Sequence, residues 1–238
     1  MDRPWITLVL AMSLDGKIAD TQRRAARFSS QADLEHLEAR VAAADGVLFG
    51  GGTLRAYGTT LSVRNPALIE ARRQRGQPNQ PIHIVWSPSG QLDPQWRFFQ
   101  QPIPRGLITT TAGAKPWQSG AHFDRLWVMP DDQIAPWNWP ELLAQFPAQG
   151  LHSLALLGGG YLTAELLRHG LVHEVYITLC PLLLGGATAP TPVDGEGFLA
   201  EVAPRLTLLE SHVVGDEVFL HYLVQSPPHR PTARRTRP

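Results

Sequence analysis

The sequence predicts a single α/β domain whose sheet is mixed but mostly parallel, flanked by helices and ending in an antiparallel C-terminal hairpin. Over the first two thirds of the chain, short apolar runs alternate with helical patterns, which is typical of parallel strands joined by right-handed crossovers. The last third holds three β-rich runs, and the turn signal V-G-D-E separates the final two. These two observations predict the fold class.

Periodicity places the individual elements. Residues 5–12 are a continuous apolar run, as expected for a strand buried on both faces. A helix is expected over 31–44, because Ser30 can cap it and apolar residues recur on one helical face. Further strands are expected in the segments 46–53, 82–86, 106–109, 125–129, 153–157, 174–180, 205–213 and 216–224, with long surface loops at 58–81 and 88–104.

The charge distribution divides the chain into a folded domain at 1–225 and a basic tail at 226–238. The 238 residues carry 21 basic and 21 acidic side chains. Four arginines and no acid lie in the tail, so the domain has 17 basic against 21 acidic residues. A Pro/Arg-rich segment without large apolar residues cannot repay its ordering entropy, so we expect the tail to be disordered.

Composition excludes several classes of protein. One cysteine, Cys180, forbids an internal disulfide and a cysteine-rich zinc module, and its apolar surroundings predict an inert buried thiol. The histidines lack metal-ligand spacing, so no metal is expected. No apolar run is long enough to span a membrane, and four tail arginines are a weak basis for nucleic-acid binding, so neither partner is expected. The N-terminal residues do not resemble a signal peptide, which predicts a cytoplasmic protein.

Two glycine turns are the strongest chemical signal. Gly158, Gly159 and Gly160 follow one predicted strand and precede a helix, and the glycines at 50–52, followed by Thr53, occupy a similar place after another strand. Glycine permits close approach of a ligand to the backbone, and a helix N-terminus favours a phosphate. Because ligands of open α/β sheets bind at the carboxyl ends of the strands, one dinucleotide could lie across both turns. Two unrelated structural turns are the alternative.

A third segment, S-L-D-G-K at 13–17, follows the first strand at the same predicted edge. It supplies the Asp15 carboxylate and the Lys17 ammonium within three residues. Lys17 and Lys115 are the two lysines of a chain with 19 arginines, which hints that a compact, titratable ammonium is needed at position 17. The alternative is an Asp-Gly turn followed by a surface lysine.

Three segments resemble a known family. They are R-P-W-I-T-L-V-L-A-M-S-L-D-G-K-I-A-D at 3–20, D-G-V-L-F-G-G-G-T at 45–53, and the block at 158–186 that begins G-G-G-Y-L-T-A-E-L-L-R-H-G and ends P-L-L-L-G-G. Together they resemble the C-terminal reductase domain of the bacterial riboflavin-biosynthesis deaminase/reductase RibD. The resemblance covers about residues 3–224 and implies a dihydrofolate-reductase-like fold.

The resemblance also implies an activity: NADPH-dependent reduction of the ribosyl group of 5-amino-6-(5-phosphoribosylamino)uracil to ribityl, with NADPH as cofactor. Lys17, with Asp15 in the same turn, would be catalytic beside the reacting sugar. Leu61 and Arg64 match substrate contacts, and Arg40 is one position from a phosphate-binding arginine. The cofactor positions implied are Ala11, Thr53, Ser87, Gly158, Gly159, Gly160, Tyr161, Leu162 and Thr163.

Four family positions differ in this chain, and they leave the substrate open. Tyr57-Gly58-Thr59 stand where the family has an acid and its neighbours, and Ala25 or Ala26 stands where it has a serine. Val41 replaces an arginine, and Leu157 replaces a second acid. One alternative is therefore an NADPH-dependent reductase of the same fold that acts on another heterocycle or carbonyl compound. The other is a nucleotide-binding relic without turnover.

The resemblance implies two further expectations about partners. A homodimer is expected, with the apolar C-terminal strands as a candidate interface. The zinc deaminase of the family would need His and Cys ligands and a glutamate, so the single cysteine predicts that deamination belongs to a separate polypeptide.

Overall fold

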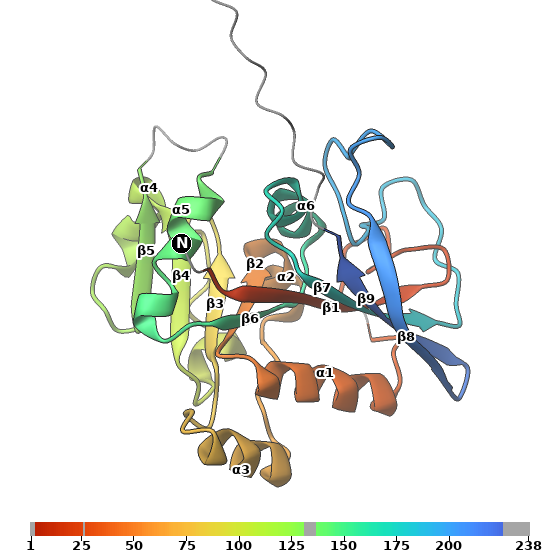
Figure 1. Ribbon diagram of the computed structural model, residues 1–238. Coiled ribbons are helices and arrows are strands. Elements are labelled where there is room, and N and C mark those ends of the chain that lie inside the picture. The colour runs from red at the N-terminus through yellow and green to blue at the C-terminus, as the bar shows by residue number, and fades with distance from the viewer. Residues whose placement is uncertain (1–2, 26, 131–136, 226–238) are drawn as a thin grey trace, which may run out of the picture.

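The computed structural model describes residues 3–25, 27–130 and 137–225, and the expected tail at 226–238 lies outside these ranges. The described residues form one nine-stranded sheet in the order β5-β4-β3-β2-β6-β1-β7-β9-β8 (Figure 1). The strands are β1 (Trp5–Ser13), β2 (Gly46–Gly50), β3 (Ile82–Trp86), β4 (Arg105–Thr110), β5 (Arg125–Met129), β6 (Ser153–Leu156), β7 (Glu174–Cys180), β8 (Leu206–Val214) and β9 (Glu217–Val224).

Strands β1 to β7 pair in parallel, whereas β9 is antiparallel to both β7 and β8. The predicted fold class is therefore confirmed, including the antiparallel hairpin at the C-terminal side. Parallel pairing also brings the carboxyl ends of β1, β2, β3 and β6 to one edge of the sheet. We call this edge, where both glycine turns begin, the carboxyl edge.

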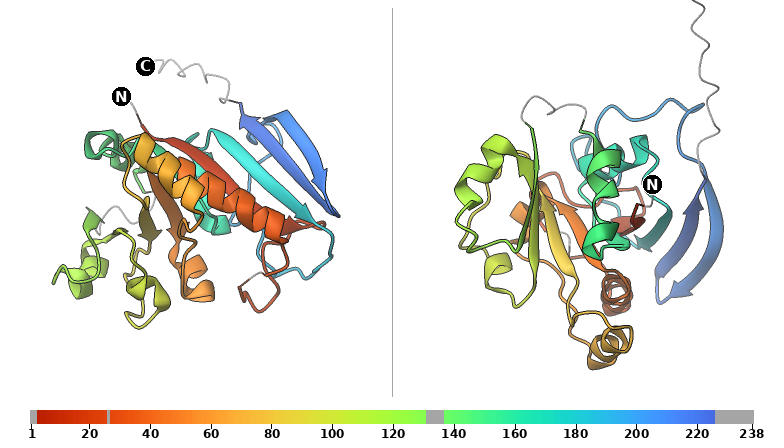
Figure 2. Two further views of the ribbon diagram at one scale, coloured as in Figure 1. Left: turned by 90° about the horizontal axis from the view of Figure 1, so that it is seen from below. Right: turned by 60° about the vertical axis from the view of Figure 1, so that its left-hand side comes forward.

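Six helices accompany the sheet in the described residues: α1 (Gln31–Ala43), α2 (Gly51–Tyr57), α3 (Pro66–Gln74), α4 (Thr111–Ala114), α5 (Trp139–Ala144) and α6 (Gly160–Arg168). Helix α1 runs alongside β1 (Figure 2). The expectation of a long loop at 58–81 is wrong, because it contains α3. Asn65 caps that helix by accepting from the Ala67 N–H, and Pro66 occupies its first turn. In the second expected loop, 88–104, Arg97–Gln100 form a 3₁₀ turn.

Two hydrophobic cores, one on each face, hold the sheet. Side chains alternate across a strand, so Leu48 of β2 packs into one core while Val47 and Phe49 pack into the other. The first core contains side chains of α5 and α6, including the fully buried Trp139. The second contains Val41 of α1 together with side chains of α2 and of the segments on either side of β3.

Side chains close the opposite, amino edge of the sheet. Asp45, just before β2, accepts the backbone N–H groups of His152 and Ser153 just before and at the start of β6. Arg72 of α3 is 1% exposed, and its guanidinium donates to the carbonyl oxygens of Ala42 at 2.9 Å, Ala44 at 2.6 Å and Pro78 at 2.8 Å. Arg72 thereby satisfies carbonyls at the end of α1 that have no partner within the helix.

A polar cluster, with Glu217 and Cys180 buried, fixes the start of α1. Ser30 caps the helix, and its N–H and hydroxyl both donate to the Glu217 carboxylate of β9. The Cys180 thiol also donates to Glu217, at 3.5 Å. Burial, and next the nearby Glu217 carboxylate, raise the pKa of Cys180 to about 12, so the thiol stays protonated and unreactive, as the sequence suggested.

Candidate functional site

The two glycine turns meet at the carboxyl edge. The Gly50 N–H donates to the Gly158 carbonyl at 3.4 Å. A Cβ atom on Gly159 would lie 3.4 Å from Thr53 Oγ1 and 3.6 Å from Gly50 N. Gly158 and Gly159 have φ of +88° and +91°, a conformation that other residues rarely adopt. The structure therefore joins the turns into one glycine-lined surface.

Ser87 lies beside this surface, at the end of β3. Its side chain is buried, and its Oγ lies 3.3 Å from the position of a Cβ on Gly51. Ala11 lies in β1, beyond β6, and is half-buried. The predicted cofactor positions therefore come from the ends of four strands, β1, β3, β2 and β6, that share the carboxyl edge.

Helix α6 begins at the second glycine turn. Thr163 and Leu162 are buried, and the Thr163 N–H donates to the Gly159 carbonyl at 3.0 Å. The N–H groups of a helix's first turn otherwise lack partners within the helix, so here the backbone, and not these two side chains, is available to an anion. The side chain of Tyr161, in contrast to those of Leu162 and Thr163, is 57% exposed and could contact a ligand.

An open pocket of about 640 Å³ extends from this turn between α6 and the end of β3. Three aromatic side chains line it: Tyr161, and Trp86 packed edge-on against Trp137 with 5.8 Å between the ring centres. The Trp86 indole nitrogen is buried and makes no hydrogen bond among the described residues. The lining also includes four charged side chains, those of Glu165, Arg168, Asp194 and Glu196.

Sequence reasoning missed this pocket. Trp137 is 5% exposed and belongs to the first core, and the same ring also lines the pocket. Asp194 lies in an irregular segment, and its N–H donates to the Gly160 carbonyl at 3.1 Å. A Cβ on Gly160 would lie 2.6 Å from Asp194 Oδ2, so glycine is required there. No local pattern in the sequence signals this contact.

The turn that carries Lys17 continues directly from β1. Ser13 is fully buried, its N–H donates to the Lys17 carbonyl at 2.9 Å, and its hydroxyl oxygen accepts the Lys17 N–H at 2.9 Å. Gly16 has φ of +78°, which the tight turn requires. The backbone of Lys17 is therefore fixed at the carboxyl edge, while its side chain is half-buried.

The Asp15 carboxylate is fully engaged. It accepts from the Ser13 hydroxyl at 2.6 Å and from the N–H groups of Leu184 and Gly185 at 3.0 and 2.6 Å. These hydrogen bonds, the one from Ser13 above all, lower the pKa of Asp15 to about 2. The side chain is therefore ionised at neutral pH.

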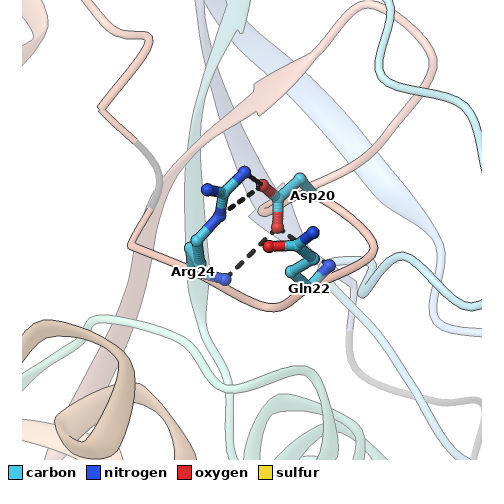
Figure 3. Close-up of polar contacts among 3 residues, drawn as sticks. All are labelled: Asp20, Gln22 and Arg24. Atoms are coloured by element: carbon cyan, nitrogen blue, oxygen red, sulfur yellow. Dashed lines mark hydrogen bonds and ion pairs between the residues drawn. The ribbon is translucent and has the colours of Figure 1, made fainter.

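The loop after Lys17 is held by a second carboxylate (Figure 3). Asp20 accepts from the Gln22 N–H at 2.9 Å and forms a two-nitrogen contact with the Arg24 guanidinium, at 3.0 and 2.8 Å. The hydrogen bond from Arg24, before other causes, lowers the pKa of Asp20. These contacts stay within residues 20–24, unlike those of Asp15.

The predicted substrate residues lie on the α1 face of the sheet. Arg40 donates to the Tyr176 hydroxyl at 3.1 Å, and its guanidinium carbon lies 4.6 Å from the centre of that ring. Leu61 is half-buried against the second core. Arg64 is exposed, and its backbone N–H donates to the Glu38 carboxylate of α1. The hydrogen bonds of Arg40 and Arg64 are thus made to β7 and α1.

Two of the positions that differ from the family are filled by packing. Val41, in place of an arginine, is fully buried in the second core, and Leu157, in place of an acid, packs against it. In the segment 57–59, Thr59 donates to the side-chain oxygen of Gln101 at 2.7 Å, which closes the loop onto the 97–101 turn.

The described residues contain no group of His, Cys, Asp or Glu suited to a metal ion. Nor does any helix among them have the length and apolarity to cross a membrane.

The model of the RibD C-terminal domain family matches residues 4–220. The chain belongs to this family. Its relatives include 2,5-diamino-6-ribosylamino-4(3H)-pyrimidinone 5′-phosphate reductases of two archaea. The protein of Archaeoglobus fulgidus is 29% identical over 83% of this chain and 89% of its own length. That of Methanothermobacter thermautotrophicus is 29% identical over 94% and 99%.

A solved structure shares the fold. It is the diaminohydroxyphosphoribosylaminopyrimidine deaminase/5-amino-6-(5-phosphoribosylamino)uracil reductase of Thermotoga maritima, with a TM-score of 0.72 and 18% identity. The match covers 94% of this RibD-family chain but 57% of the Thermotoga protein. The family predicted from the three sequence segments is thus confirmed.

Proposed function

We propose that this RibD-family chain is an NADPH-dependent reductase of riboflavin biosynthesis that reduces the ribosyl group of 5-amino-6-(5-phosphoribosylamino)uracil to ribityl. The observation that carries the proposal is the contact between two glycine turns beside the Lys17 turn, in a chain that matches the family over 4–220. The archaeal relatives are named for the diamino form of the pyrimidine, so both forms are candidate substrates.

The residues present fit a dinucleotide. Its pyrophosphate would lie against Gly158–160 and the first N–H groups of α6, with Thr53 and Ser87 beside it. Two features support this placement: a side chain on Gly159 would fill the space at Gly50 and Thr53, and the buried Trp86 nitrogen in the adjoining pocket has no hydrogen-bond partner among the described residues. The aromatic pocket suits a flat adenine ring.

Lys17 would act on the opened, imine form of the sugar. When bound, the nicotinamide supplies a hydride to C1′. The electron pair of the C=N bond then moves to nitrogen, and the Lys17 ammonium donates the proton that completes the amine. Arg64, with an exposed side chain, would bind the 5′-phosphate. Leu61 would contact the same substrate, and Arg40 would have to leave Tyr176 to do so.

Absorbance at the nicotinamide band tests the proposal. Purified protein should oxidise NADPH in the presence of the deaminated or the diamino pyrimidine. Lys17→Met should lower turnover by about 10²- to 10⁴-fold, the usual contribution of a proton donor, with little change in NADPH affinity. NADPH binding without oxidation by either pyrimidine would contradict the proposed substrates.

The packed substrate side favours a second candidate. Val41 and Leu157 replace an arginine and an acid with a buried and a partly buried apolar side chain, so a less polar heterocycle or carbonyl compound is the alternative substrate of the same cofactor site. Oxidation of NADPH by such a compound, but by neither pyrimidine, would support it.

We also propose that two copies associate through β8. All nine residues of this edge strand are exposed, including Leu208 at 51% and Val213 at 68%. Antiparallel pairing about Ser211 would place Glu210 of one copy opposite His212 of the other.

Sedimentation velocity should show a dimer for the wild type and for the control Val128→Lys on the other edge strand, and a monomer for Val213→Lys. A monomeric wild type would contradict the proposal.

A further inference from the structure

The segment that follows β7, P-L-L-L-G-G at 181–186, lies against the Lys17 turn. Its Leu184 and Gly185 N–H groups point at one carboxylate, that of Asp15, which is 169 and 170 residues away in sequence. Gly185 and Gly186 have φ of +65° and +82°. Successive N–H groups in such a curled backbone form a concave site for an anion. Here the protein's own carboxylate fills it.

Ser13 connects this contact to Lys17. Its buried hydroxyl donates to Asp15 and accepts the Lys17 N–H, so one oxygen joins the two residues. The Leu14 N–H also donates to the Leu182 carbonyl at 2.9 Å, which adds a second connection between the two segments. Movement of Asp15 would therefore move Ser13 and the backbone of Lys17.

We propose that Asp15 is a positioning residue that anchors the Lys17 turn to Leu184 and Gly185, and that it does not exchange protons with the substrate. This inference rests on the proposed function, because it takes Lys17 as the group that acts on the sugar. Each oxygen of Asp15 already accepts a backbone N–H, and Oδ1 accepts the Ser13 hydroxyl as well. A carboxylate engaged in this way fixes geometry, and a misplacement of about 1 Å in an active site can cost about 10²-fold in rate.

Asp20 provides a matched control. It lies in the same loop, and hydrogen bonds lower its pKa as they do that of Asp15. Its partners, however, are Gln22 and Arg24, within its own turn (Figure 3). Asp20→Asn therefore removes a comparable charge without touching the contact between Asp15 and the 184–185 backbone.

The position of Lys17 can be measured without turnover. Reductive methylation with ¹³C-formaldehyde labels the two lysines and the terminal amine, and Lys17→Arg and Lys115→Arg variants assign the signals. In Asp15→Ala, the Lys17 methyl signal should move toward that of freely mobile dimethyl-lysine, while the Lys115 signal stays in place and reports an intact fold. Asp20→Asn should change neither signal. An unchanged Lys17 signal in Asp15→Ala would overturn the proposal.

Turnover separates positioning from proton transfer. Asp15→Asn keeps one acceptor oxygen, whereas Asp15→Ala keeps none, so kcat should fall about 100-fold in the alanine variant and clearly less in the asparagine variant, with KM for NADPH within about twofold of wild type. A proton donor would be lost equally in both, and equal losses would overturn the proposal. If Asp15→Ala does not fold, Ser13→Ala serves in its place and should move the same Lys17 signal.

The outcomes also distinguish this inference from the proposed function. A shifted Lys17 signal in Asp15→Ala, together with wild-type turnover of Lys17→Met, would refute the role of Lys17 at the sugar but retain Asp15 as the anchor of the turn. An unshifted signal together with an inactive Lys17→Met would refute Asp15 as the anchor but retain the role of Lys17 at the sugar.

Discussion

The same strands form the amino and the carboxyl edge of the parallel sheet, but the backbone groups at the two edges have different partners. At the amino edge, side chains saturate the backbone: Arg72 donates to three carbonyls, and Asp45 accepts two N–H groups. At the carboxyl edge, a Cβ atom on Gly50 or Gly158 would meet no other atom within 4 Å, and α6 begins with N–H groups that lack helical partners. The contacts at the amino edge stabilise the fold, and the carboxyl edge is the candidate surface for a ligand.

The largest expected effect comes from a charge at the carboxyl edge. Gly159→Asp should abolish NADPH binding, because it places a carboxylate against the pyrophosphate. Gly159→Ala is the control, since both variants strain a φ of +91° but only one adds charge. Titration followed by nicotinamide fluorescence should show at least about a 100-fold weaker affinity for the aspartate variant relative to the alanine variant, which corresponds to about 2.8 kcal/mol. Equal affinities would mean that the turn is only structural.

At the amino edge, removal of Arg72 should destabilise the fold without affecting the cofactor. Arg72→Ala removes the donor of the buried Ala44 carbonyl and weakens the contacts to Ala42, which keeps Arg75, and to Pro78, so the free energy of unfolding in urea should fall by about 1–3 kcal/mol. Arg73→Ala, at the exposed neighbouring position, should stay within about 0.5 kcal/mol of wild type. A loss of NADPH affinity in folded Arg72→Ala would contradict the claim that the amino edge affects stability alone.

A smaller effect should appear in the pH dependence of stability. His83, near the start of β3, is fully buried, and desolvation, with Arg72 and Arg105 nearby, lowers its pKa to about 3. The unfolded chain takes up a proton near pH 6.5 while the folded chain does not, so the stability from His83 is present above that pH and decreases below it. Between pH 7 and 5 the loss should be about 2 kcal/mol.

Urea unfolding at the two pH values checks this expectation. His83→Gln should reduce the difference between pH 7 and 5, whereas His152→Gln, an exposed histidine on the same edge, should not. An equal acid sensitivity in both variants would place its origin elsewhere in the molecule.

The same comparison explains what the sequence could predict. The glycine turns were visible because each follows an apolar strand directly, and parallel pairing alone then places both at one edge. Helix α3 was missed because its sequence carries few apolar residues, and its position is fixed by the Asn65 cap, buried Arg72 and the partly buried Leu68 and Ile69. The contacts of Asp15 with Leu184 and Gly185 could not be predicted from the sequence, because backbone N–H groups 169 and 170 residues away leave no local pattern.

Transfer of deuterium tests most directly whether the carboxyl edge carries out a reduction. NADPH deuterated at C4 of the nicotinamide, in each of its two stereochemical forms, is incubated with the protein and either pyrimidine. The ribityl product should gain one deuterium at C1′ from one form only, because a nicotinamide bound in one orientation would present a single face to the sugar. No deuterium in the product from either form, with NADPH bound, would contradict a reductase at this edge.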